Sequence, residues 1–97
     1  MKHFDLKIAN VEWLKSFGFQ NLQKDGGGSQ WIWSDLKTLG MTQFVFLLIA
    51  NVDKNDLTFV VFDRRHPGPP PTEGMTAVWI EDNEKLIIEQ LKEANII

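Results

Sequence analysis

The sequence predicts an α+β fold: a mostly antiparallel sheet of about five to six strands, with a short N-terminal helix and a C-terminal helix. Three features of the chain indicate this fold. Residues 3–8 alternate between polar and apolar, residues 44–50 are apolar without interruption, and apolar residues recur at helical spacing near the C-terminus. With 97 residues, of which 43% are apolar, the chain is expected to form a single domain over 1–97.

The N-terminal segment predicts a strand and then a short helix. The alternation over 3–8 is typical of a half-buried strand. Asn10 is a suitable N-cap for the next element, a helix, and Gly18 stands where a left-handed C-cap would end it. The apolar stripe of this helix consists of Trp13, Leu14 and Phe17.

A hairpin is predicted next. A weak strand over 19–24 leads into the glycine-rich loop 25–29, and residues 30–33 form the returning strand. The segment 35–39 is then expected to form a helical turn that Gly40 ends.

The strongest signal is the strand predicted over 43–51, whose apolar residues would be buried on both faces. After a polar turn over 53–56, residues 57–62 form its expected antiparallel partner. Two helices on one face of this sheet leave the other face without a cover. The candidates to close it are the 35–39 turn, the strand that carries Trp31 and Trp33, or a second subunit.

The remainder of the chain predicts a loop, a strand and a helix. All four prolines lie in the stiff, exposed loop expected over 64–74, and residues 75–80 are expected to form a final strand. Asp82 is the expected N-cap of the closing helix over 83–95. Its apolar stripe consists of Ile87, Ile88, Leu91 and Ala94.

Composition excludes several classes of function. The chain has no cysteine, which rules out disulfides, thiolate metal sites and thiol nucleophiles and fits a reducing compartment. The N-terminus has no apolar signal region, and the apolar run over 44–50 is far shorter than the roughly 20 residues of a membrane span. We therefore expect a soluble, cytoplasmic protein with no membrane partner.

Charge and histidine content argue against nucleic acid and metal. The net charge is −3 and the isoelectric point is about 5.2, whereas nucleic-acid binders usually present a basic face. Binding of single-stranded nucleic acid through stacking on tryptophan is a weaker hypothesis, because the chain is acidic. His3 and His66 are the only imidazoles, and no ligand spacing accompanies them. No metal or cofactor is expected.

The loop over 64–74 is the first candidate contact site. It contains a basic-x-x-Pro-x-x-Pro pattern, which Src-homology-3-type grooves accept because a polyproline helix is already ordered. A rigid surface loop used for another protein contact, or a stiffened crossover without a binding role, would show the same residues. The candidate contact residues are Arg64, Arg65, His66, Pro67, Pro69 and Pro70.

Trp31 and Trp33 are a second candidate contact site, because residues two apart on a strand share one face. Paired aromatic rings serve as interface anchors when they are exposed. A small domain also needs large side chains to fill its core, and core filling is the competing interpretation. In a protein–protein contact through the proline-rich loop, this pair would adjoin the loop.

The first functional hypothesis is a small non-enzymatic binding or regulatory protein that acts through protein–protein contacts. An inhibitor, an immunity-type protein or an assembly subunit would all fit, and so would a homo-oligomer that associates through the open side or an edge of the sheet. The alternative is a domain that binds an anion or a sugar, with or without enzymatic activity, through Asp63, Arg64 and His66 with a tryptophan wall. Arginine forks suit carboxylates and phosphates, which is the basis of that alternative.

Overall fold

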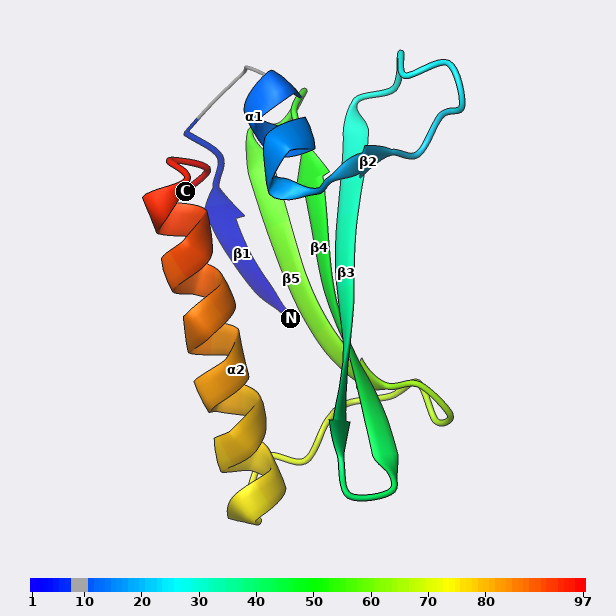
Figure 1. Cartoon of the computed structure of the whole chain (residues 1–97), viewed down its shortest axis with the longest axis vertical. Helices are drawn as coiled ribbons and strands as arrows, with labels where there is room; N and C mark the ends of the chain where they lie inside the picture. The colour runs from blue at the N-terminus through cyan, green and yellow to red at the C-terminus, as the bar shows by residue number, and fades with distance from the viewer. Residues whose placement is uncertain (8–10) are drawn as a thin grey trace.

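The computed structural model describes residues 1–7 and 11–97. Its elements are β1 (Lys2–Asp5), α1 (Val11–Phe17), β2 (Gln20–Asn21), β3 (Gln30–Leu39), β4 (Thr42–Asn51), β5 (Asp56–Asp63) and α2 (Gly74–Glu93). The strands form one antiparallel sheet in the order β1-β5-β4-β3-β2, with α2 lying along one side of it (Figure 1). The predicted α+β fold, with a short N-terminal helix and a C-terminal helix, is confirmed.

Three long strands joined by tight turns make the centre of the sheet. Leu39 pairs with Thr42 across a turn in which Gly40 has φ +62°, a left-handed conformation that costs glycine little. The helical turn predicted over 35–39 is wrong, because this segment is the second half of β3. Ladder pairing with β4 satisfies its backbone groups, which a single isolated turn would not do as fully.

The predicted strand over 75–80 is also wrong. This segment forms the first turns of α2, which begins at Gly74, so Asp82 lies inside the helix and is not its N-cap. Burial explains the difference, because the buried side chains of α2 lie three, seven and four residues apart, which is the spacing of one helix face. They are Ala77, Ile80, Ile87 and Leu91.

Residues 11–17 form the predicted N-terminal helix, and Gly18 ends it as expected. Gly18 has φ +121°, and the amide of Phe19 donates to the carbonyl of Leu14 at 2.9 Å. The predicted cap Asn10 and the last residue of the predicted strand over 3–8 lie outside the described residues. In the structure β1 runs from Lys2 to Asp5 and pairs with β5, so it begins one residue before the predicted strand and ends before Leu6.

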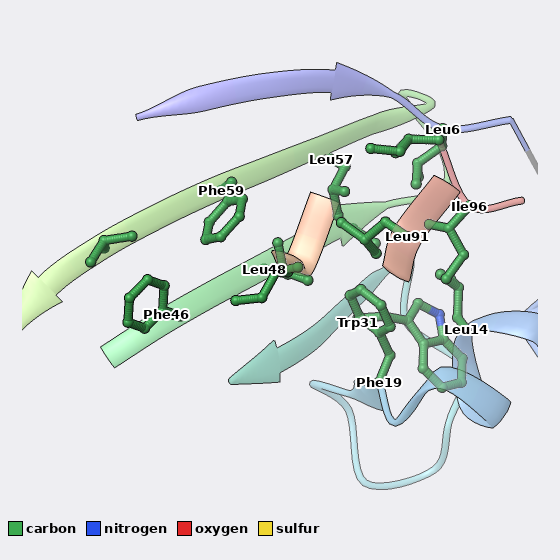
Figure 2. Packing of buried hydrophobic residues seen from close by; sticks show 14 of the residues in the cluster. Leu6, Leu14, Phe19, Trp31, Phe46, Leu48, Leu57, Phe59, Leu91 and Ile96 are labelled. Atoms are coloured by element: carbon green, nitrogen blue, oxygen red, sulfur yellow. The ribbon is translucent and has the colours of Figure 1, made fainter. Parts of the chain in front are cut away.

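The core lies between the sheet and the two helices. Alternate residues of the long strands point toward α1 and α2, among them Leu57, Phe59 and Val61 of β5. Figure 2 shows Trp31 of β3 close to Leu14 of α1 and to Phe19, inside this cluster. The fully or almost fully buried members include Leu14, Phe46, Leu48, Leu57, Phe59, Leu91 and Ile96.

No helix of residues 1–7 and 11–97 packs on the opposite side of the sheet. On β4 the residues that point to this side are only half-buried, so the prediction of a strand buried on both faces holds for one face alone. We call this side the open face and define its apolar part as Ile32, Leu36, Val45, Leu47, Ile49, Val60 and Phe62. Two of the three predicted covers are absent: residues 35–39 belong to β3, and Trp31 and Trp33 point toward the helices.

Neither helix of the described residues is long and apolar enough to cross a membrane.

Candidate functional site

The proline-rich loop connects β5 to α2 and occupies residues 64–73. The sequence placed it between two strands, and the misread start of α2 accounts for that error. Every residue of the loop is exposed except Pro70, which is half-buried. The expectation of an exposed loop is therefore confirmed.

Hydrogen bonds to neighbouring residues hold the start of this loop. The backbone amide of Arg64 donates to the carbonyl of Gln43 at 2.9 Å, and its guanidinium Nη1 donates to the side-chain Oε1 of Gln43 at 2.7 Å. The amide of Arg65 donates to Oδ1 of Asp63 at 2.9 Å, which closes a local turn. The first residues of the loop are thus fixed to β4 rather than free to swing.

The prolines lie beside the part of β5 that has no strand at its outer side. β1 pairs with β5 only from Asp56 to Phe59, and the later residues of β5 leave an edge there. Met1, Val60, Phe62 and the segment 67–70 line a surface hollow of about 430 Å³ at this edge. A loop beside an unpaired strand edge hinders the addition of a further strand there.

The two arginines of the loop carry positive charge without an acidic partner. Arg64 is bonded to the neutral amide of Gln43, and the guanidinium of Arg65 has no partner among residues 1–7 and 11–97. The ion pairs of the described residues lie elsewhere: Lys2 with Glu84, His3 with Asp56, Lys15 with Glu12, and Lys37 with Asp35. Both guanidiniums are therefore available to a carboxylate or phosphate outside this chain.

Asp63 and His66, two residues of the alternative anion or sugar site, form no hydrogen bond to each other among the described residues. The carboxylate of Asp63 instead accepts the backbone amide of Arg65. His66 is exposed, and the described part of the chain contains no hydrogen bond from its ring to Asp63. A general base oriented by a carboxylate needs that contact within hydrogen-bond reach.

Trp31 and Trp33 do not adjoin the loop. Trp31 is 4% exposed and lies under α1, and Trp33 is half-buried against Phe17 with ring centroids 5.7 Å apart. Core filling is therefore the interpretation that their positions support. Trp33 pairs with Leu48, whereas the loop begins beside Gln43, which is about 16 Å further along the strand at 3.3 Å per residue.

A polar cluster on the open face was not foreseen from the sequence. Nδ1 of His3 lies 3.2 Å from Oδ2 of Asp56, and the hydroxyl of Thr58 donates to the same oxygen at 3.1 Å. The alternation over 3–8 shows that His3 points away from the core side. It does not show that β1 pairs with β5, because His3 and Asp56 are 53 residues apart in sequence.

A second surface hollow, of about 460 Å³, lies along the first turns of α2. Its lining includes Met75, which is 91% exposed, together with Val78 and Trp79. The hollow offers apolar contact and contains the single carboxylate of Asp82, so it lacks the convergent polar groups of a catalytic site.

Comparison with known proteins provides no family. No protein-family model, no curated protein and no solved structure matches the chain. Within residues 1–7 and 11–97, no group of three His, Cys, Asp or Glu side chains could hold a metal ion. Any function must therefore be argued from the surfaces of the molecule itself.

Proposed function

We propose that this protein is a non-enzymatic binding protein that acts through protein–protein contacts, with the 64–73 loop as its contact surface. The observation that carries the proposal is the pair of guanidiniums at Arg64 and Arg65, which are exposed and have no acidic partner in the described chain. Arginine forks bind carboxylates with two parallel hydrogen bonds, so the partner surface should be acidic.

The fixed shape of the loop supports the same proposal. Gln43 and Asp63 hold its first two residues, and prolines restrict much of the remaining backbone of the loop. A loop that is ordered before it binds loses little conformational entropy in the complex, which favours affinity. An inhibitor, an immunity-type protein and an assembly subunit would all use such a loop. A cytoplasmic location belongs to this proposal and is supported by the lack of cysteine.

The alternative, an anion or sugar site, has less support. Asp63 is engaged by the backbone of Arg65, and the nearest hollow is lined mostly by prolines and apolar side chains. The two tryptophans that were considered as a wall lie on the core side of β3, away from the loop.

The test is the double substitution Arg64→Ala/Arg65→Ala in a pulldown from the native host lysate. We expect this variant to lose proteins that the original chain retains. Its melting temperature should stay almost the same, because exposed side chains change stability by only about 0.5 kcal/mol. The matched control is Lys24→Ala/Lys54→Ala, which removes the same charge from exposed loops at the other end of the sheet.

Equal retention of partners by the arginine variant and by the original chain would contradict the proposal. A large fall in melting temperature for the arginine variant alone would make these side chains structural. Thermal unfolding followed by circular dichroism, run on both double variants, separates loss of binding from loss of fold.

A further inference from the structure

The residues of the open face form cross-strand rows with a regular order. The strand register aligns five rows along the strands, with a polar row at each end and mostly apolar rows between them. In order they are Gln30–Asn51–Asp56, Ile32–Ile49–Thr58, Ser34–Leu47–Val60, Leu36–Val45–Phe62 and Thr38–Gln43–Arg64. An apolar centre with a polar rim is the usual composition of a protein interface.

Opposite charges lie at the two ends of this face. Arg64 follows the last residue of β5, and Asp56 begins β5 on the same face, about 26 Å away at 3.3 Å per residue. Asp5 of β1 is the direct neighbour of Asp56 in the sheet. The outward positions between the two ends carry no Lys, Arg, Asp or Glu on the three long strands.

We propose that the open face binds the open face of a second copy of this chain. Each strand lies over the same strand of the second copy, and the two run in opposite directions. The two-fold axis crosses the strands at the central row, Ser34–Leu47–Val60, so each row lies over its counterpart from the other end. This inference rests on the proposed function, since it names the acidic partner of the arginine loop as the Asp5–Asp56 end of the second copy.

The row order fits this arrangement. Leu47 and Val60 belong to the central row, and the two-fold axis places this row over the central row of the partner copy. The row of Ile49 lies over the row of Val45. Arg64 lies over Asp56 of the other copy, so each end of the interface joins opposite charges. With the strands running in the same direction, the two arginine ends would instead meet each other, which is unfavourable.

The face has the size of a small dimer contact. At 3.3 Å per residue and about 4.8 Å per strand, the ten residues each of β3 and β4, the eight of β5 and the four of β1 cover about 500 Å² of sheet. Two copies together would bury about 1,000 Å², which is the lower limit for a specific interface.

The test measures dimerisation of the full chain by sedimentation equilibrium, from about 1 μM to about 500 μM, a range that covers dissociation constants from micromolar to near millimolar. We expect Leu47→Lys to weaken the dimer at least about 30-fold, because it places a charge in the centre of the contact. Val78→Lys is the matched control, since Val78 is 58% exposed on α2 and lies outside the open face. It should leave dimerisation unchanged.

Charge reversal tests the orientation. Arg64→Asp and Asp56→Arg should each weaken the dimer about tenfold, because each places like charges opposite one another across the interface, and the double variant should recover most of the loss. The proposal is overturned if the chain stays monomeric throughout, if Leu47→Lys dimerises like the original chain, or if the double reversal is as weak as the singles. If the chain is monomeric and the Arg64→Ala/Arg65→Ala variant loses pulldown partners, this inference is wrong and the proposed function is supported. If the chain is monomeric and this variant retains every partner, both this inference and the proposed function are wrong.

Discussion

At the scale of the residue, the two neighbouring arginines have different surroundings. The guanidinium of Arg64 is held by Gln43, whereas Arg65 is fixed only through its backbone amide, by Asp63. Arg64 therefore presents its charge in a defined direction, and the side chain of Arg65 keeps its rotamer freedom. A partner carboxylate meets one preorganised fork and one adaptable fork, a combination that the letters of the sequence do not distinguish.

Gly18 provides a test at the same scale. Its φ of +121° lies in a region that other residues rarely adopt, and an added Cβ would lie 3.2 Å from Cδ1 of Trp33. We expect Gly18→Ala to lower the free energy of unfolding by about 1–2 kcal/mol. Gly68→Ala is the control, because its nearest neighbour would be 3.9 Å away, and it should change stability by less than about 0.5 kcal/mol. Urea titration of both variants is the measurement, and equal stability of the two would contradict the expected cap.

The position of the tryptophans shows what a residue pattern can and cannot predict. The spacing of Trp31 and Trp33 places both rings on one face of a strand. Which face that is depends on where α1 packs, and α1 lies on the same side as both rings. The sequence therefore predicts that both rings lie on the same face of the strand, whereas their burial depends on a separate element.

At the scale of the element, α2 shows how a strand pattern and a helix pattern overlap. Val78 and Ile80 are apolar and β-branched and stand two apart, which favours a strand over 75–80. In the structure Ile80 is buried and Val78 is 58% exposed, because residues two apart point to different sides of a helix. Six residues are too few for periodicity to separate the two cases.

This difference predicts an asymmetric pair of substitutions. Ile80→Ala should lower the free energy of unfolding by about 2–4 kcal/mol, since it leaves a cavity between α2 and the sheet. Val78→Ala should change it by less than about 0.5 kcal/mol. In a strand the two side chains would share one face and the two losses would be similar. Guanidinium denaturation of both variants distinguishes these outcomes.

The prediction of a helical turn over 35–39, the second half of β3, is wrong for a different reason. Residues 35–39 end at Gly40, and a glycine after apolar residues is equally typical of a helix C-terminus and of a two-residue hairpin turn. Ten ladder pairs with β4 decide in favour of the strand. That pairing involves a second segment, so local sequence does not contain it.

At the scale of the whole molecule, the last residues of the chain close the open end of the core. Ile96 is completely buried, and its carbonyl accepts the amide of Lys7 at 2.9 Å. Residues near both ends of the chain therefore meet beside β5. This contact joins positions that are far apart in sequence.

Ile96 is accordingly expected to matter more than its position suggests. Ile96→Ala should lower the free energy of unfolding by about 2–4 kcal/mol, as for other buried isoleucines. Leu86→Ala is the control, because Leu86 is 54% exposed on α2, and it should have little effect. Thermal and chemical unfolding of the two variants provide the measurement, and a small loss for Ile96→Ala would show that the C-terminal residues do not complete the core.

The open face also belongs to this scale. The apolar run over 44–50 predicts that both sides of β4 need a cover, and the fold provides one on a single side. The side that remains, with charges only at its ends, is the basis of the proposed dimer. The same register that pairs the strands therefore also defines the surface offered to a second copy.

Local patterning alone was enough to predict the α+β class, the central hairpin, the cap at Gly18 and the exposed arginine–proline loop. Those features depend on residues that are neighbours in sequence, through turn geometry, side-chain alternation and the stiffness of proline. Only the folded chain decides the start of α2, the length of β3, the burial of Trp31 and the position of Asp56 beside His3 and opposite the arginine end. Each of these depends on which segments pack together, and packing between distant segments carries no signal within a short window of sequence.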